Sequence, residues 1–152
     1  LSHKRGINMI RVEKVKEVNT EIVQTIQNLF PQLTQFSPIP DEDALRKMVH
    51  SQVSSLWIAR NEDDEIIAML SLAIYRTTTG IHAWIEDVVV DQKARRQGVA
   101  GQLTQAALEF AQQNGAKAVS LTSRPERDAA NQLYQKLGFE LVKTNLYRKN
   151  LR

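Results

Sequence analysis

The chain has 152 residues, of which 42% are hydrophobic and 24% charged, and a formal net charge of +3. This length fits one domain and is sufficient to bury a core without covalent cross-links. The composition excludes a wholly disordered chain. Because the sequence contains no cysteine, disulfides, zinc–thiolate sites, iron–sulfur clusters and cysteine nucleophiles are excluded as well.

The sequence also indicates where in the cell the protein lies and which kinds of partner it lacks. No apolar run reaches the ~18–20 residues of a membrane span, and the first residues lack the apolar region of a signal peptide. We therefore expect a cytoplasmic protein without a membrane partner. Residues 1–8 are interpreted as a tag or upstream extension, and residues 9–152 as a single domain. The small basic excess forms no stripe interleaved with aromatics, so no nucleic-acid partner is expected.

The first part of the chain predicts a strand, two helices and an antiparallel meander. A short strand is expected at residues 10–15, and apolar residues recur at helical spacing over residues 19–33. Asp41 is a candidate N-cap for a second helix, whose apolar positions continue to Val53. Three strands are then predicted at residues 56–60, 65–76 and 81–90.

The second part of the chain alternates helices and strands. A helix is expected from Val99 to the C-cap signal Asn114-Gly115, and another from residue 129 to Gly138. A strand at residues 118–121 separates them, and one or two strands at residues 139–147 close the chain.

This order, βααβββαβαβ, predicts an α+β fold with a mixed, mostly antiparallel twisted sheet flanked by helices. The β-α-β crossovers make strands 85–90 and 119–121 expected parallel neighbours.

The segment from Asp87 to Gly101 predicts an anion site. A strand leads into a loop rich in Arg and Gly, and the loop leads into a helix. The first N–H groups of a helix are unpaired and carry its positive dipole end. Gly98 allows close approach of the backbone, and Arg95 and Arg96 add donors that suit phosphate oxygens. The other interpretation is a glycine turn with two solvated arginines; the common ATP-binding and dinucleotide-binding glycine motifs are absent.

Two motifs together resemble a known family. Arg95-x-x-Gly98-x-Ala100 matches the pattern Arg/Gln-x-x-Gly-x-Gly/Ala of the GNAT superfamily of N-acetyltransferases, in which this loop holds the pyrophosphate of acetyl-CoA. Residues 130–139 match its second signature, Ala-x-x-Leu-Tyr-x-x-x-Gly-Phe. The resemblance covers nearly the whole chain from Met9 to Arg148. It implies the acyl-CoA N-acyltransferase-like fold and acetyl-CoA as co-substrate.

The resemblance also implies which residues contact acetyl-CoA. In the strand–loop–helix segment they are Val88, Val89, Val90, Arg95, Arg96, Gln97, Gly98, Val99, Ala100 and Gly101. On the last helix the candidates are Arg127 and Asn131. Arg127 stands seven residues before Tyr134, where many members have asparagine, so that family contact is not carried over. A backbone N–H of Val88 or Val89 is the expected donor to the carbonyl oxygen of the acetyl group.

Glu86 is the candidate base. Acetyl transfer requires a deprotonated amine, which costs about 4–5 kcal/mol at neutral pH for a lysine-like group. A carboxylate can accept that proton directly or through water. Strand alternation groups Glu86 with Trp84, Val88 and Val90, and so apolar a strand should desolvate the carboxylate. The other interpretation is that Glu86 pairs with an arginine or caps a buried polar cluster.

Tyr134 is the candidate acid. Its neutral hydroxyl is a donor, with an ordinary pKa of ~10 that matches a thiolate leaving group. The resemblance implies a position near the thioester sulfur. The other interpretation is a tyrosine at the edge of the core, with its hydroxyl in water.

The remaining expectations concern the reaction as a whole. Without cysteine, an amine acceptor would attack the thioester directly in a ternary complex. By analogy the acceptor lies near residues 30–40 and 144–147, and a homodimer is common in the family. The three histidines have no metal-ligand spacing, so no metal is expected.

Two alternatives stay open: a non-catalytic CoA-binding sensor or assembly subunit, and an interaction domain whose arginines bind nucleic-acid phosphates.

Overall fold

Five strands form one sheet in the first of two units of the chain. The computed structural model describes residues 9–152, so the interpretation of residues 1–8 lies outside it. The chain divides into Leu1–Thr122 and Ser123–Arg152, and each unit is described by itself.

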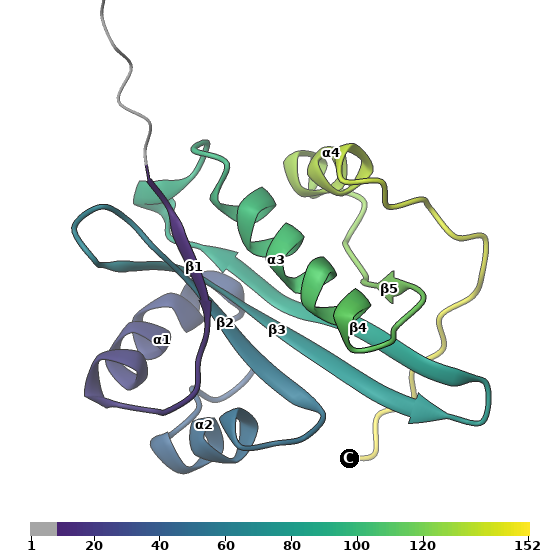
Figure 1. The fold of residues 1–152 in the computed structure, drawn as a ribbon, viewed down its shortest axis with the longest axis horizontal. Helices are drawn as coiled ribbons and strands as arrows, with labels where there is room; N and C mark the ends of the chain where they lie inside the picture. The colour runs from purple at the N-terminus through teal and green to yellow at the C-terminus, as the bar shows by residue number, and fades with distance from the viewer. Residues whose placement is uncertain (1–8) are drawn as a thin grey trace, which may run out of the picture. The chain divides into compact units, whose positions relative to one another are not determined.

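The sheet has the strand order β1-β2-β3-β4-β5. Its strands are β1 (Arg11–Lys14), β2 (Ser54–Arg60), β3 (Ile66–Thr77), β4 (Gly80–Val90) and β5 (Val119–Ser120) (Figure 1). The first four are antiparallel to their neighbours, and β5 runs parallel to β4. The predicted α+β class is confirmed, and so is a parallel pairing of these two strands. The paired residues differ from the prediction, because Ala83 and Trp84, and not residues 85–90, lie beside Val119 and Ser120.

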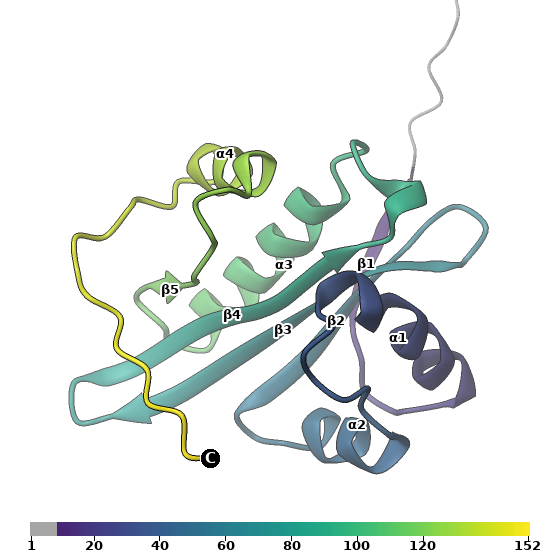
Figure 2. The same ribbon diagram turned by 180° about the vertical axis from the view of Figure 1, so that it is seen from behind.

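Helices cover both faces of this sheet. Helix α1 (Thr20–Leu33) and helix α2 (Glu42–Val49) lie on one face, and helix α3 (Val99–Gln113) lies on the other (Figures 1 and 2). The N-terminal ends of α1 and α2 are capped by side chains, because Asn19 accepts from the Ile22 N–H and Asp41 from the Ala44 N–H. No helix in the described part of the chain, residues 9–152, is long and apolar enough to cross a membrane.

The second helix is shorter than predicted. It ends at Val49, and Val53 lies 47% exposed in the connection to β2. The side chain of Ser51 accepts hydrogen bonds from the N–H groups of Val53 and Ser54, at 3.0 Å each. This local turn competes with the helix, as serine side chains do at helix ends.

The main core lies between the sheet and helices α1 and α2. It is built from apolar residues spaced three or four apart on the helices and alternate residues on the strands. The buried members are Val15, Val18, Ile22, Ile26, Leu29, Leu45, Val49, Leu56, Ile58, Ile66, Met69 and Val89. On the α3 face, Leu103, Ala107 and Ala111 are fully buried, and Trp57 packs edge-on against Phe110.

A buried arginine joins α1 to the sheet. The guanidinium of Arg60 on β2 donates to both carboxylate oxygens of Glu21 at 2.7 and 3.0 Å and to Glu13 on β1 at 2.9 Å. It also donates to the backbone oxygen of Asp64 at 2.9 Å. The hydrogen bond from Arg60, followed by its charge, lowers the pKa of Glu21 against the opposing effect of burial. A bidentate pair of this kind fixes the helix orientation.

Glu21→Gln is expected to lower the free energy of unfolding by about 1 kcal/mol at pH 7, a value reduced for solvent screening. Because the native pKa of Glu21 lies below its ordinary 4.5, this stabilisation is present above that value and is lost as pH falls through the native pKa. Urea unfolding at a series of pH values measures both effects. Glu65→Gln, an exposed carboxylate without a side-chain partner among the described residues, is the control. A gap between wild type and Glu21→Gln that persists at pH 2 would contradict the prediction.

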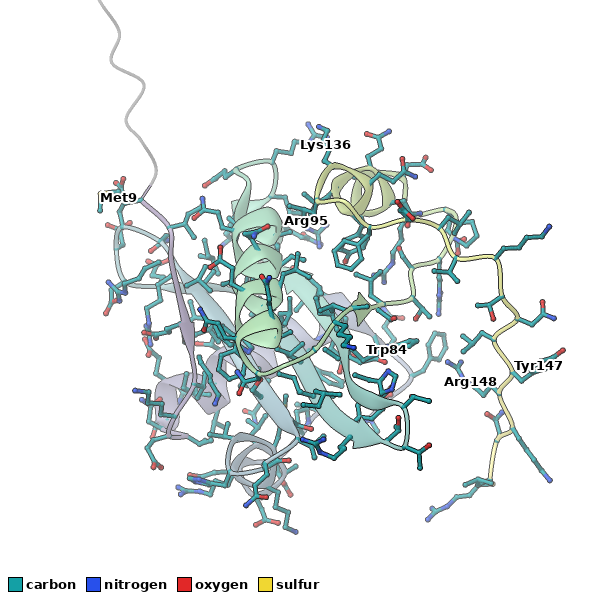
Figure 3. All side chains as sticks on the ribbon, turned by 45° about the vertical axis from the view of Figure 1, so that its right-hand side comes forward. Met9, Trp84, Arg95, Lys136, Tyr147 and Arg148 are labelled. Carbon is teal, nitrogen blue, oxygen red and sulfur yellow. The ribbon has the colours of Figure 1, made fainter. Side chains whose placement is uncertain are left out.

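The second unit contains one helix and an extended segment. Helix α4 (Asp128–Lys136) is followed by Gly138, whose φ of 91° ends it as predicted. The strands predicted at residues 139–147 were wrong, because residues 139–152 have no regular structure. An alternating pattern forms a strand only with a hydrogen-bonding partner, and the structure gives this segment none among residues 9–152. Leu141 is 99% exposed, and Tyr147 and Arg148 lie on this extended stretch (Figure 3).

Candidate active site

A β-bulge interrupts β4 at the predicted site. Ser71 pairs with Glu86 and Met69 pairs with Val89, so that Leu70 faces two residues, Asp87 and Val88. Asp87 adopts a left-handed conformation with φ 53°. Such an extra residue disrupts the hydrogen-bond ladder and redirects the side chains that follow.

The bulge corrects the predicted alternation of side chains. Glu86 was grouped with Val88 and Val90, but the pairing places Val89 on the face of Glu86, and Val90, paired with Ala68, on the opposite face. Val89 belongs to the core under α1 and α2. Glu86 therefore lies on the α1/α2 face of the sheet.

Glu86 is exposed, so the expected burial was wrong. The strand around it is apolar, but the bulge follows it directly and the edge of β4 is open there. No ion pair or side-chain hydrogen bond engages its carboxylate within residues 9–152. The alternative that Glu86 pairs with an arginine is therefore wrong as well, and the carboxylate is accessible to an incoming group.

The edge of β4 beside Glu86 has no strand partner on the β5 side. The parallel pairing joins only Ala83 with Val119 and Trp84 with Ser120. From Ile85 to Val90, β4 is paired with β3 alone in the part of the chain that the structure describes. Unpaired backbone groups at a sheet edge can pair with an extended ligand.

The loop after β4 is held in a defined conformation. The N–H of Asp91 donates to the backbone oxygen of Ile67 on β3 at 2.8 Å, and the Asp91 carboxylate accepts from the N–H of Lys93. This caps the short helix η1 (Gln92–Ala94). The guanidinium of Arg95 donates back to the oxygen of Val90 at 3.1 Å. Figure 3 shows Arg95 beside the start of α3.

The start of α3 is open to an anion. Arg96 and Gly98 adopt left-handed conformations with φ 65° and 77°, and no side chain caps the helix at Gly98. The first intrahelical bond is that of Gln102 to Gly98, which leaves the N–H groups of Val99, Ala100 and Gly101 without intrahelical partners. A Cβ placed on Gly98 would meet no atom within 4 Å.

The charges around this helix start are unbalanced. Arg95 and Arg96 form no ion pair with a carboxylate of residues 9–152. Together with the dipole of a 15-residue helix, they make a site that favours a phosphate group. The residues predicted to bind the anion form one continuous segment, Val88–Gly101, which includes Gln97.

The other predicted site residues lie on α4 in the second unit. Arg127 is the residue before the helix, and its side chain makes no capping hydrogen bond to the first turn. The side-chain amide of Asn131 donates to the backbone oxygens of Arg124 and Pro125, at 3.0 and 3.4 Å. Its amide N–H groups therefore hold the turn before α4.

Tyr134 is half-buried on α4. Its ring packs edge-on against Phe139, with 5.7 Å between the ring centroids. Burial raises the pKa of Tyr134 above its ordinary 10.0, and the positive charge of Arg127 partly offsets this shift. The hydroxyl is therefore a neutral donor throughout the physiological pH range.

A cavity in the first unit is lined by none of the predicted site residues. It has a volume of about 570 Å³ and is lined near the end of α3 by Phe110 and Asn114 and on β1 by Lys14. The Lys14 ammonium lies 4.8 Å from the Phe110 ring centroid. The candidate site is instead the bulge, the open edge of β4 and the start of α3. No cluster of three metal-ligating side chains occurs within residues 9–152.

Two features of the site carried no signal in the sequence. The bulge at Asp87 follows no glycine or proline, and a left-handed aspartate is recognisable only in the structure. Gln32, near the end of α1, accepts a hydrogen bond from the N–H of Gln92 at 3.0 Å. The two residues are 60 positions apart, and only the packing of α1 on the sheet brings them together.

Comparison with known proteins shows the family of the chain. The sequence profile of the acetyltransferase (GNAT) family matches residues 21–139. The chain belongs to this family. GNAT proteins are N-acetyltransferases, so the predicted enzyme class is confirmed.

Two relatives in the family are similar in sequence. N-alpha-acetyltransferase 30 of Schizosaccharomyces pombe is 30% identical over 103 residues, which cover 68% of this chain and 68% of that protein. The Bacillus subtilis N-acetyltransferase YhfO is 28% identical over 134 residues, which cover 83% of this chain and 89% of that protein.

Solved GNAT structures share the fold. An aminoglycoside acetyltransferase from an uncultured soil metagenomic sample, meta-AAC0020, has a TM-score of 0.79 at 21% identity, over 93% of this chain and 96% of that one. Glucosamine-6-phosphate N-acetyltransferase of Arabidopsis thaliana has a TM-score of 0.73 at 19% identity, over 93% and 98%. The aminoglycoside N-acetyltransferase AAC(6')-Iy, solved with CoA, has a TM-score of 0.76 at 19% identity, over 98% and 99%. At these identities the likeness establishes the fold and leaves the acceptor open.

Proposed function

We propose that this protein transfers an acetyl group from acetyl-CoA to a primary amine, which attacks directly in a ternary complex. The observation that carries the proposal is the uncapped start of α3. There, three N–H groups have no intrahelical partner, and Arg95 and Arg96 have no carboxylate partner among residues 9–152. This helix start follows directly on the loop after β4. A relative solved with CoA supports the same ligand class.

The residues of this segment fit acetyl-CoA. The N–H groups of residues 99–101 and the guanidinium groups of Arg95 and Arg96 would hold the diphosphate. The backbone groups of β4 at Val88–Val90 that have no partner would pair with the amide-containing arm, as a sheet edge pairs with an added strand. The oxygen of Val90 is not one of them, because it accepts from Arg95. Gly98 leaves space that any side chain would fill. When bound, acetyl-CoA supplies an acetyl thioester that is activated toward nitrogen nucleophiles.

In this proposal Glu86 accepts the proton of the amine. Its carboxylate lies on the α1/α2 face of β4, one residue before the bulge, and is accessible to solvent. An exposed carboxylate can act directly or through one water. A backbone N–H freed at Val88 or Val89 would donate to the acetyl carbonyl oxygen, since the bulge breaks the ladder there.

We place the acceptor beside the connection between α1 and α2. This stretch contains Phe36, which is 92% exposed, and Ile39, which is 51% exposed. An unpaired aromatic ring of this kind supplies contact area for a ligand. It follows the helix that covers the same face of the sheet as Glu86. A cytoplasmic location is part of the proposal, because a chain without cysteine suits a reducing compartment.

Tyr134→Phe is expected to lower kcat about 100-fold, because Tyr134 would give a proton to the departing thiolate. Since burial raises its pKa above 10.0, the hydroxyl keeps its proton as pH rises to that value. Deprotonation of Tyr134 should therefore not lower the wild-type kcat between pH 8 and pH 10. A pH–rate profile checks both points, with Tyr75→Phe as the control. A wild-type kcat in Tyr134→Phe would contradict the assignment of Tyr134 as the acid. A decline of kcat below pH 10 that disappears in Tyr134→Phe would contradict its raised pKa.

The exposure of Glu86 favours one second candidate, a non-catalytic CoA-binding sensor or assembly subunit. Calorimetric titration with acetyl-CoA tests the feature that both candidates share. Saturable binding at micromolar concentrations supports either. Absence of heat at millimolar acetyl-CoA would overturn both and leave the arginine loop as a structural turn.

A further inference from the structure

The loop of the candidate site is anchored to α1 by one side chain. The oxygen Oε1 of Gln32 accepts a hydrogen bond of 3.0 Å from the backbone N–H of Gln92. Gln92 is the first residue of η1, and Gln32 is the penultimate residue of α1. A loop residue and a residue near the end of α1, 60 positions apart, are thus joined at the surface.

The loop needs such an anchor because its conformation is not the one its residues prefer. Arg96, a residue with a Cβ, holds a φ of 65°, which costs free energy for a residue that is not glycine. The start of η1 is fixed by two groups from outside the loop. These are the backbone oxygen of Ile67, which accepts from Asp91, and the side chain of Gln32.

The chemistry of this contact also matters. Gln92 lies in the loop that leads into α3, whose first N–H groups form the proposed anion site. Without an acceptor, this N–H would turn to water, and η1 would lose a constraint on its first residue. The positions of Arg95 and Arg96 depend on that residue, because η1 directly precedes them.

We propose that Gln32 is a positioning residue for the anion-binding loop and that it raises the affinity for CoA without touching the ligand. This inference rests on the proposed function, because it assigns the loop to the diphosphate. The bond is exposed, and a bond of this kind contributes a threefold to tenfold change in an equilibrium constant.

The first test removes the acceptor and keeps the size of the side chain. Gln32→Met is expected to weaken CoA binding about threefold to tenfold in calorimetric titration. Gln24→Met is the matched control, because Gln24 is an exposed residue of the same helix. It should leave the affinity unchanged. Urea unfolding of both variants shows whether α1 itself has been destabilised.

The second test removes the donor. Gln92→Pro deletes the N–H at the first position of η1, where proline is tolerated. Asp91 has ψ 137°, which lies in the range preferred before proline and outside the helical region. If the two groups act through their bond, Gln92→Pro and Gln32→Met weaken CoA binding by the same factor, and the double variant is no weaker than either.

Hydrogen exchange of the Gln92 amide separates this inference from the proposed function. Exchange should accelerate about threefold to tenfold in Gln32→Met and stay unchanged in Gln24→Met. If wild type binds no CoA, the proposed function fails, while the exchange result still tests the anchor. The inference is overturned if Gln32→Met leaves the affinity of a CoA-binding wild type unchanged, if it leaves the exchange unchanged, or if the effects of the two substitutions multiply in the double variant.

Discussion

Glu86→Gln is expected to lower kcat about 10²- to 10⁴-fold, the range that a positioned general base contributes. The glutamine has the same shape and cannot accept the proton of the amine. The affinity for acetyl-CoA should stay the same, because the anion site lies in the loop and helix beyond the bulge. Steady-state kinetics with an acceptor amine and calorimetric titration measure the two quantities separately.

The neighbouring carboxylate provides the control. Asp87 is also exposed and adopts φ 53°, a conformation that asparagine tolerates as well as aspartate does. Asp87→Asn removes the same charge one residue away and should change kcat less than about threefold, as expected for a surface substitution. If the two variants lose activity equally, the charge of this strand matters and Glu86 is not the base.

The double variant Arg96→Glu, Gly98→Glu is expected to weaken acetyl-CoA binding roughly 100-fold or more. Each lost charge-assisted hydrogen bond costs about 1.5–3 kcal/mol, and the introduced carboxylates repel the diphosphate. The side chain at residue 98 would also fill the space left by a glycine with φ 77°. Calorimetric titration of wild type and variant measures the difference.

A matched pair of substitutions exists at the far end of the sheet. Gly80 also has a positive φ, 126°, and no atom within 4 Å of an added Cβ. Arg76, like Arg96, forms no ion pair within residues 9–152. Arg76→Glu, Gly80→Glu therefore reproduces the charge reversal away from the loop and also places a side chain on a glycine with positive φ. Equal loss of binding in both double variants would mean that net charge or stability, and not a diphosphate site, causes the effect.

The order of secondary structure could be predicted because local signals mark the ends of its elements. Asn19 and Asp41 cap their helices as their side-chain chemistry requires. At the end of α3, Gly115 has φ 90° and donates to Gln112, while Ala116 donates to Ala111. This is the hydrogen-bond pattern that Asn-Gly at a helix end predicts.

The prediction failed where the outcome depends on partners distant in sequence. The pattern at residues 139–147 favours a strand, yet a strand needs a neighbour, and Leu141 is 99% exposed instead. In β4, strict alternation placed Glu86 in an apolar environment. One extra residue opposite Leu70 changed the face of every later side chain.

The residues of the proposed anion site are contiguous, whereas those proposed as acid and base are not. Arg95, Gly98 and the first turn of α3 are contiguous, so sequence alone brings them together. The anchor at Gln32 could not be predicted, since it depends on where the last turn of α1 meets the loop. The roles of Glu86 and Tyr134 stay proposals, because the two residues belong to separate units of the chain.

The most direct measurement is the release of CoA thiol from acetyl-CoA in the presence of a panel of primary amines. A thiol-reactive dye reports it without background, because the protein has no cysteine. The panel should include an aminoglycoside, glucosamine 6-phosphate, a peptide with a free N-terminus and a peptide with an internal lysine. We predict amine-dependent thiol release by wild type and its loss in Glu86→Gln. Tight binding of acetyl-CoA without amine-dependent release for any member of the panel would contradict a catalytic site and identify a CoA-binding module.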